Sequence, residues 1–255
     1  MIAAIVLAGG VDRGELAAQT GIIHRPLLEV GGRPILLSTL AALRGAAAVA
    51  TITLVGPEPV QAIAPADAVD ARAPEGDTFL GSIIQGLAAA PASSDHLLVI
   101  TGDLPLITAE AIDDFVRHSL RSGAEVCYPI IPKDSCERRF PGGRRTYVRL
   151  REGTFTGGNA VLATRSFLER SQRLIARLYA ARKNPLKLAT LFGLPFIFGL
   201  LTGRLTIRQL EDRASAIISG RVAAIISHYP ELGFDVDKVE DLEVARRAAA
   251  TASRD

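Results

Sequence analysis

The first 36 residues read MIAAIVLAGGVDRGELAAQTGIIHRPLLEVGGRPIL, and they open with an unbroken apolar run. Ile2–Leu7 contains β-branched residues and is too short for a helix, which predicts a strand buried on both faces at the centre of a parallel sheet. The pair Gly9–Gly10 follows and lets the backbone approach a ligand closely, with amide N–H groups free to point at it. Arg13 and Arg25 come next, before Pro34 opens a predicted helix. A buried strand, a bare backbone turn and two cations together predict a polyphosphate site.

Two better-known phosphate-binding loops begin in the same way, and neither fits. The dinucleotide fingerprint requires G-x-G-x-x-G, which Gly9–Asp12 does not supply. Gly9 and Gly14 have the spacing of a P-loop, but Glu15 and Leu16 follow where a lysine and a hydroxyl are required. A carboxylate at that position would repel the phosphate that the loop should hold.

The stretch instead resembles the nucleotidyltransferase signature LAGG-x(n)-R…K-P-L-L-P-V-G-G-R-P. The matching residues are Leu7–Gly10, Arg13, Arg25–Leu28 and Val30–Pro34. On these residues the chain is similar to the MobA-like (molybdenum-cofactor guanylyltransferase-like) and sugar-1-phosphate nucleotidyltransferases. Two positions depart from the signature, since Arg25 replaces its lysine and Glu29 replaces its second proline. Arginine keeps the charge and can bind phosphate through two N–H groups, but it is not equivalent to lysine at a site shaped for a point charge.

The resemblance implies an α/β fold of the three-layer, Rossmann-like GT-A type, with a mostly parallel sheet flanked by helices. It also implies a reaction in which a nucleoside monophosphate passes from an NTP to a phosphorylated acceptor and pyrophosphate is released. In that reaction Arg13 and Arg25 would be catalytic cations that hold the triphosphate. The nucleotide would bind the backbone of Leu7, Ala8, Gly9 and Gly10.

A second apolar run, Leu97–Thr101, predicts another buried strand and ends in Gly102–Pro105 with the sequence GDLP. Ligands of open α/β sheets bind beyond the carboxyl ends of the strands, where Asp103 would lie. Taken alone, Asp103 favours a cap of the turn before the predicted helix Thr108–Leu120. The family carries the same G-D-x-P, and its aspartate binds Mg²⁺ on the nucleotide phosphates. The resemblance therefore implies that Asp103 is catalytic as a Mg²⁺ ligand and that Gly102 contacts the nucleotide. Because Mg²⁺ keeps water and phosphate ligands, one or two aspartates suffice.

The segment between these two strands carries a weaker match. Pro57–Pro74 is rich in proline and alanine and is expected to be irregular. Asp77–Ala90 has apolar residues at helical spacing, which predicts a helix. Gly81 and Ser82 in this helix correspond to the family's G-S or G-T, which contacts the nucleobase. An ordinary serine on a helix surface is the alternative for Ser82.

A third match lies in the second half of the chain, at Gly157, Gly158 and Asn159. These residues resemble the family segment that lines the acceptor pocket. Two glycines allow close backbone approach, and an asparagine offers both donors and an acceptor. A β-bulge or turn is the alternative, because glycine and asparagine are also the usual turn residues.

Near the carboxyl end, Gly233–Leu242 reads GFDVDKVEDL and resembles the family's G-x-D/N-x-D/N-T-P-E-D-L. Asp237 precedes Glu240 by three residues at the start of an amphipathic pattern, the spacing of a capping box, so we expect Asp237 to be a helix N-cap. Asp235 lies in the extended segment before it and is free to face Asp103. We therefore predict Asp235 as the second Mg²⁺ ligand.

Residues 188–203 carry no charge and are flanked by basic residues, within a predicted apolar helical insertion at 184–207. The run is shorter than the roughly 20 residues that span a bilayer, and Gly193, Pro195 and Gly199 interrupt it. Three interpretations stay open. The segment is a broken buried helix pair or a homodimer interface, an apolar acceptor pocket, or a membrane-surface face that contacts lipid phosphates.

The composition sets wider limits. With 255 residues and 48% hydrophobic content, the chain is predicted to be a single domain, with a nucleotide-binding half at 1–123 and an acceptor half at 124–255. A net charge of +2 without a basic stripe gives no case for a nucleic-acid polymer, so the expected partners are an NTP and a phosphorylated small molecule. Cys127 and Cys136 fit neither a metal pair nor a disulfide framework, as in a cytoplasmic protein with reduced thiols. Met1 leads straight into the first strand, so we do not expect a signal peptide.

Two other functions stay open. A GT-A glycosyltransferase would carry a D-x-D pair at the end of the metal-binding strand, which Gly102–Pro105 lacks. A nucleotide-binding regulatory or scaffold protein with decayed catalysis is consistent with the changes at Arg25 and Glu29. Tight NTP binding without pyrophosphate release would distinguish it. Neither the base nor the acceptor follows from the sequence.

Overall fold

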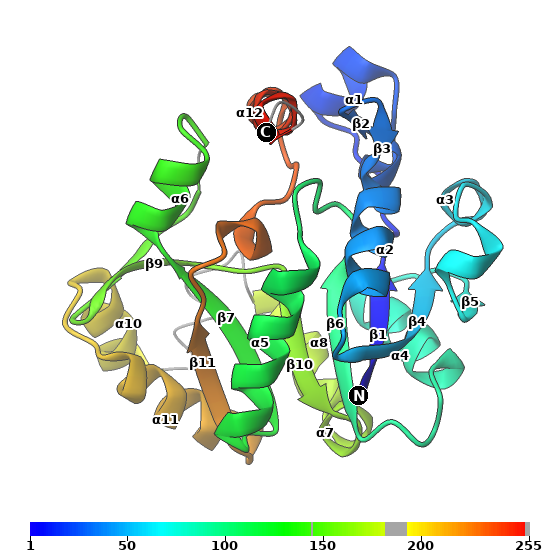
Figure 1. Cartoon of the computed structure of the whole chain (residues 1–255). Coiled ribbons are helices and arrows are strands. Elements are labelled where there is room, and N and C mark those ends of the chain that lie inside the picture. Colours follow the sequence, from blue (N-terminus) through cyan, green and yellow to red (C-terminus); the bar gives the residue numbers. More distant parts are fainter. Residues whose placement is uncertain (144, 182–192, 253–255) are drawn as a thin grey trace.

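The protein forms three layers, with a sheet in the middle and helices on both faces (Figure 1). The structure is a computed structural model and describes residues 1–143, 145–181 and 193–252. Within these ranges the sheet has nine strands. In their order across the sheet they are β5 (Ala71–Ala73), β4 (Val49–Val55), β1 (Ile2–Leu7), β6 (His96–Thr101), β10 (Ala160–Thr164), β7 (Val126–Pro132), β9 (Gly153–Gly157) and β8 (Val148–Leu150), while β11 (Val222–Ile226) pairs with β7.

The part of the sheet formed by residues 1–123 is parallel throughout. β1 lies between β4 and β6, and all of its residues are buried, as its unbroken apolar run predicted. Leu7 is in register with Val55 on one side and with Thr101 on the other. The carboxyl ends of these strands therefore meet at one edge of the sheet. The predicted α/β fold with a mostly parallel sheet between helices is confirmed.

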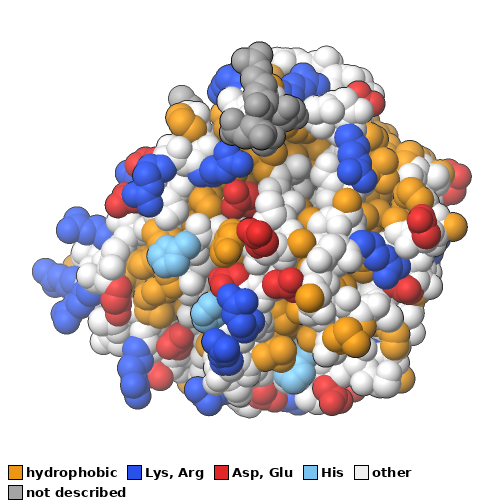
Figure 2. Space-filling model, viewed as in Figure 1, with side chains coloured by type: hydrophobic (Ala, Val, Ile, Leu, Met, Phe, Trp, Pro, Cys, Tyr) orange, Lys and Arg blue, Asp and Glu red, His pale blue; other side chains and the backbone are white. Residues whose placement is uncertain are grey.

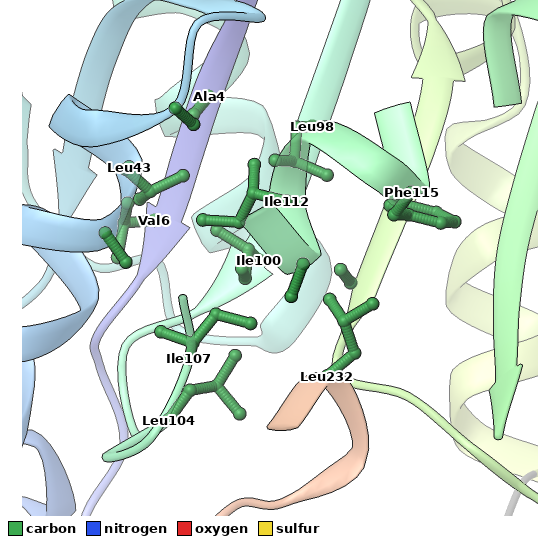
Figure 3. Packing of buried hydrophobic residues seen from close by; sticks show 14 of the residues in the cluster. Ala4, Val6, Leu43, Leu98, Ile100, Leu104, Ile107, Ile112, Phe115 and Leu232 are labelled. Atoms are coloured by element: carbon green, nitrogen blue, oxygen red, sulfur yellow. The ribbon is translucent and has the colours of Figure 1, made fainter. Parts of the chain in front are cut away.

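Alternate residues of β1 belong to two separate cores. Ala4 and Val6 face the helices α2 (Ile35–Gly45) and α5 (Ala109–Ser122), and the packing of this core with Phe115 and Leu43 is shown in Figure 3. Ile5 faces the other side. The helices that cover this second core are α4 (Phe79–Ala89), α7 (Arg165–Arg170), α8 (Gln172–Ala181) and α11 (Ile207–Ile218).

Residues 124–255 add strands of both directions to the sheet. β10 runs antiparallel to both β6 and β7, and β9 continues along β7 beyond it. β8 and β9 form a hairpin, next to which α10 (Leu194–Leu201) packs on β8. The helix α6 (Lys133–Arg139) follows β7 directly. This half therefore continues the same sheet with antiparallel pairs, while β11 runs parallel to β7.

A third core closes the carboxyl edge of the sheet. It joins the first loop to the end of the chain through Leu16, Leu28, Phe234 and Leu242. The residues that supply it include members of α1 (Glu15–Thr20), of β2 (Glu29–Val30), which forms a hairpin with β3 (Arg33–Pro34), and of α12 (Val239–Ala252). Leu28 and Phe234 directly follow the 3-10 turns η1 (Arg25–Leu27) and η3 (Pro230–Gly233). Segments far apart in sequence thus meet above the ends of β1 and β6.

Two local expectations need correction or completion. Pro57–Pro74 is not irregular, because it holds α3 (Glu58–Ala62), the 3-10 turn η2 (Ala66–Ala68) and β5. β5 pairs with the end of β4, and Val60 is fully buried, so tertiary contacts outweigh the proline content. In the apolar insertion, residues 184–192 lie outside the described ranges, and α10 forms from Leu194 to Leu201. No helix in the described part of the chain has the length and apolar character to cross a bilayer.

Candidate active site

A cavity of about 560 Å³ lies at the carboxyl edge of the sheet. It is bounded by the loop after β1, the start of α4 and the end of β6. The predicted site residues that line it are Leu7, Gly9, Gly10, Arg25, Ser82 and Asp103. The sheet topology thus brings together the two stretches with the strongest match to the family signature.

The backbone after β1 presents an N–H group to this cavity, and a carboxylate accepts a hydrogen bond from that group. Gly10 N donates a hydrogen bond to Glu75 Oε2 at 2.8 Å. Gly10 has a φ of +93°, which a residue with a side chain rarely adopts, and a Cβ on Gly9 would collide with Glu75. The ring nitrogen Nδ1 of the buried His24 lies 2.9 Å from Gly10 O. The loop is therefore held so that Gly10 N–H meets an anionic oxygen.

The first turn of α4 forms the opposite wall. Thr78 is its N-cap, since Thr78 Oγ1 accepts a hydrogen bond from Gly81 N at 3.0 Å. Ser82 Oγ accepts another from Gly76 N at 3.0 Å, so Ser82 is not an ordinary surface serine. A Cβ on Gly76 would overlap the backbone of Gly81. Gly81 therefore supports the wall from behind, while Ser82 faces the cavity.

An aromatic pair closes one side of the cavity. Phe79 and Tyr179 stack with ring centroids 4.2 Å apart and an angle of 3° between their planes, and both line the cavity. Tyr179 comes from α8, in the second half of the chain. Flat aromatic faces are the surfaces on which nucleobases stack. The sequence analysis did not find this pair, because two aromatic residues 100 positions apart carry no local signal.

Arg25 lies among carboxylates from three parts of the chain. Its guanidinium pairs with Asp237, reaches Asp103 Oδ2 at 3.7 Å and reaches Asp12 Oδ2 at 3.8 Å. Arg25 and Asp103 line the first cavity, whereas Asp237 lines a neighbouring one. The ion pair of Arg25 with Asp237 therefore marks the place where the two cavities meet.

The second cavity has a volume of about 330 Å³ and holds the predicted acceptor residues Gly157 and Asn159. They belong to a bulge in which Gly158 N donates to Pro129 O on β7, while Asn159 O accepts from Thr101 N at the end of β6. A Cβ on Gly158 would meet Pro129 and the Leu232 carbonyl, so Gly158 packs behind the cavity. The bulge that was the alternative interpretation is present, and it places Asn159 at the cavity.

Arg145 and Asp235 form the floor of the second cavity. Arg145 donates to Asp235 O at 2.8 Å and to Asp241 Oδ1 at 3.1 Å, and its guanidinium lies over the Phe234 ring. Asp103 lies close enough to influence the titration of Asp235. The two predicted metal ligands therefore approach each other from β6 and from the segment before α12.

Both carboxyls are in surroundings that disfavour their charged form. Burial raises the pKa of Asp235 to about 7, and the nearby charges of Asp103 and Asp237 add to the rise, against the opposing effect of Arg145. Burial also raises the pKa of Asp103, and the Thr101 hydroxyl and the Arg25 guanidinium oppose that rise. Buried carboxylates that repel one another gain from a cation between them.

The fit of a Mg²⁺ ion rests on one further observation. Asp103 Oδ1 is buried, and no donor among the described residues makes a hydrogen bond to it. Within the same ranges, no group of three or more His, Cys, Asp or Glu side chains is placed to hold a metal ion alone. This arrangement fits Mg²⁺, which takes one or two carboxylates and completes its ligands with phosphate oxygens and water.

The predicted N-cap at Asp237 is wrong. α12 begins at Val239, and Asp241 Oδ2 accepts hydrogen bonds from the backbone N–H groups of Asp237 and Lys238 at 3.2 and 3.0 Å. The Asp237 side chain instead forms its ion pair with Arg25. With Arg25 the carboxylate gains a full opposite charge as well as a hydrogen bond, whereas a backbone N–H group offers only the hydrogen bond.

Several predicted site residues lie outside the cavity linings. Arg13 is exposed in the loop before α1 and lines neither cavity. Ala8 and Gly102 are buried behind the first cavity, where a Cβ on Gly102 would press on Ala8. Their small size lets the ends of β1 and β6 approach each other. On the face of the molecule in Figure 2, Lys and Arg side chains are interspersed with Asp and Glu rather than gathered in one patch.

Four residues that shape the site were not predicted from the sequence. They are Asp12, Glu75, Arg145 and Tyr179. Asp12 carried a usable signal, because it lies within the loop between the two glycines and Arg25. Glu75, Arg145 and Tyr179 reach the site only through the fold, from segments without a motif.

Comparisons with known proteins agree with this geometry. Residues 4–187 match the model of the MobA-like NTP transferase domain. A hypothetical transferase from Thermus thermophilus is 39% identical, with a TM-score of 0.82 over 94% of this chain and 99% of that one. The 4-diphosphocytidyl-2C-methyl-D-erythritol synthase from Anaerococcus prevotii is 16% identical, with a TM-score of 0.59 over 97% of each chain. A CMP:2-keto-3-deoxy-manno-octonic acid synthetase, in complex with CTP, is 13% identical, with a TM-score of 0.62 over 98% of this chain and 99% of that one. The last two likenesses concern the fold alone. A search of curated proteins gave no match.

Proposed function

The chain belongs to the MobA-like NTP transferase family and is a nucleotidyltransferase, and we propose that it transfers a nucleoside monophosphate from a Mg²⁺-bound NTP to a phosphorylated small molecule, with release of pyrophosphate. The observation that carries this proposal is the hydrogen bond between Gly10 N–H and a carboxylate oxygen, in one cavity with Arg25 and Asp103. An N–H group held toward an anion at the end of a buried strand suits a phosphate oxygen equally well.

The nucleotide would lie in the first cavity. Its phosphates would displace Glu75 from Gly10 N–H, and its base would lie between the wall at Ser82 and the aromatic pair of Phe79 and Tyr179. Arg25 would neutralise the leaving pyrophosphate, once the phosphates draw it from Asp237. Arg13 would act on the triphosphate only after a movement of the loop that carries it.

The acceptor would lie in the second cavity, at Gly157 and Asn159. An oxygen of its phosphate attacks the α-phosphorus in line, a new P–O bond forms, and the bond from the α-phosphorus to the bridging oxygen of pyrophosphate breaks. Asp103 and Asp235 would hold Mg²⁺, which neutralises charge on the α-phosphate during this exchange. The protein's own contribution is to position the two substrates across the junction at Arg25.

The test is the thermal stability of the protein with ATP, CTP, GTP or UTP, each with and without Mg²⁺. CTP comes first because one structure with the same fold holds it. A nucleotide at a hundred times its Kd stabilises by roughly 2.7 kcal/mol, which raises the Tm of a protein of this size by about 5–10 °C. We expect one nucleotide to produce this shift and Mg²⁺ to increase it. No shift with any nucleotide would contradict the proposal.

Asp103→Asn is the matching variant. We expect it to keep the fold, to lose the additional stabilisation by Mg²⁺ and to lower pyrophosphate release at least ~100-fold, because a neutral amide is a poor ligand for a hard cation. Turnover near that of the unchanged protein would refute the role of Asp103.

A regulatory protein with decayed catalysis is the second candidate. The engagement of Arg25 by Asp12, Asp103 and Asp237 favours it, because these pairs compete with phosphate for the guanidinium. Pyrophosphate release separates the two candidates. A protein that binds NTP tightly and releases no pyrophosphate with any phosphorylated acceptor would be regulatory.

A further inference from the structure

An apolar groove of about 360 Å³ lies beside the second cavity. Its walls come from β7, β8, β9 and β11 and from the helices α10 and α11, elements that lie on the left side of Figure 1. The larger side chains that line it are Tyr128, Phe155, Phe196, Leu200 and Leu210. The groove is therefore built from elements that lie outside the nucleotide-binding half.

Within the described part of the chain, the groove offers few polar side chains to a ligand. Among its lining residues the charged one is Glu211, and Glu211 Oε1 accepts a hydrogen bond from the backbone N–H of Ala224 at 2.8 Å. On α10 beside the groove, Phe198 and Leu201 are exposed. An open apolar surface of this kind usually marks a binding site.

The groove and the second cavity share part of their lining. Thr156 and Gly157 line both of them. Tyr128 marks the junction, because a Cβ on Gly157 would collide with the Tyr128 hydroxyl. The same hydroxyl lies within the electrostatic influence of Asp235. The lining thus changes from carboxylates, Arg145 and Lys238 in the second cavity to aliphatic and aromatic side chains in the groove beside it.

We propose that the acceptor is a monophosphate ester of an aliphatic alcohol, whose phosphate binds in the second cavity and whose hydrocarbon chain lies in the groove. This inference rests on the proposed nucleotidyl transfer and names the class of its acceptor. The surface matches such a molecule at both ends, with Arg145 and Lys238 near the phosphate and an apolar channel for the chain. A sugar phosphate would leave the groove unused, because each of its hydroxyls would lose water there without a partner.

The test measures the binding of ethyl, butyl, hexyl and octyl monophosphate by calorimetry, in the presence of Mg²⁺ and the nucleotide that stabilises the protein. Each added methylene that enters the groove is expected to tighten binding about fourfold. Pyrophosphate release with the same series should show the same dependence in KM.

A matched pair of variants on α11 locates the effect. Ala214 lines the groove, whereas Ala216 on the same helix is exposed and does not line it. Ala214→Phe should fill the groove and remove most of the dependence on chain length, with ethyl phosphate and NTP binding unchanged. Ala216→Phe should leave every measurement as it is in the unchanged protein.

The outcomes separate this inference from the function on which it rests. Normal NTP binding with no dependence on chain length, or an equal dependence in Ala214→Phe, would overturn the acceptor class alone. If the unchanged protein bound no NTP, the proposed function itself would be overturned. If Ala214→Phe abolished a dimer seen by sedimentation and chain length had no effect, the groove would be an interface between copies of the chain. Equal binding to vesicles with phosphate headgroups and to neutral vesicles, without an effect of chain length in the alkyl phosphates, would likewise overturn the proposal.

Discussion

Asp103, Asp235 and Asp237 show which contacts of a residue can be predicted from the sequence and which depend on the fold. The first two were predicted as a pair because each follows a motif of the family, and the fold brings them within electrostatic reach. The partner of Asp237 could not be predicted, because Arg25 lies 212 positions away and the spacing to Glu240 pointed to a cap. Local rules fail here because the guanidinium that Asp237 meets comes from a distant segment, which only the fold brings to it.

At the residue scale, replacement of Asp235 tests whether its surroundings disfavour the charged carboxylate. The pKa of Asp235 rises from 3.8 to about 7 in the folded protein. Because the folded state then binds the proton more tightly than the unfolded state, stability falls as the pH rises from about 4 to about 7 and stays low above it. Asp235→Asn removes this loss. Without metal at about pH 8 we expect the variant to be more stable by at least ~1 kcal/mol, a rise in Tm of about 2–4 °C.

Thermal unfolding of both proteins between about pH 4 and pH 8 measures this effect. The Tm of each protein is compared with its own Tm at the acid end, where Asp235 of the unchanged protein is protonated. The two proteins should converge there. With Mg²⁺ and nucleotide at about pH 8 the order should reverse, because only the aspartate binds the ion. A variant that is less stable than the unchanged protein at every pH would show that Asp235 is not under charge repulsion.

At the scale of single elements, α4 links helix capping to the site. Its N-cap Thr78 and the turn that it closes line the first cavity. Thr78→Ala should cost about 1 kcal/mol of stability. It should also weaken NTP binding severalfold, because the wall at Ser82 depends on the first turn of this helix.

Thr108→Ala is the control for this prediction. Thr108 is the N-cap of α5 and accepts a hydrogen bond from Ala111 N at 3.2 Å, but it does not line the cavity. We expect a similar loss of stability, with NTP binding unchanged. Equal effects of the two substitutions on nucleotide affinity, measured by titration calorimetry, would mean that the α4 cap has no part in the site.

Elements with a continuous apolar pattern could be predicted, and elements that depend on their neighbours could not. β1 matches the predicted range, because its six residues are all apolar and all buried. α1 was missed within the loop before Arg25, since only Leu16 of its short sequence is buried. β5 could not be predicted either, because its three residues become a strand only by pairing with β4. The glycines of the bulge at 157–158 were noticed, but only the register of β9 and β10 along β7 explains them.

At the scale of the whole molecule, one core joins the two halves that the sequence analysis separated at residue 123. The cluster on the α2 and α5 face contains Ala4 and Val6 from the first half and Leu162, Ile225 and Leu232 from the second. Asp235 can face Asp103 only because this core fixes β11 and η3 relative to β6. We therefore propose that the chain unfolds as one unit.

Phe115→Ala tests this unity from the centre of the shared core. Phe115 lies on α5, is fully buried and packs within the cluster that both halves supply. Its truncation should cost about 3–5 kcal/mol, because it removes a large buried ring and leaves a cavity. In calorimetry the unchanged protein should show one transition with equal calorimetric and van't Hoff enthalpies, and the variant should show the same single transition at a lower Tm. Two transitions, of which Phe115→Ala shifts one, would mean that the halves fold separately and that the site between them forms only after they dock.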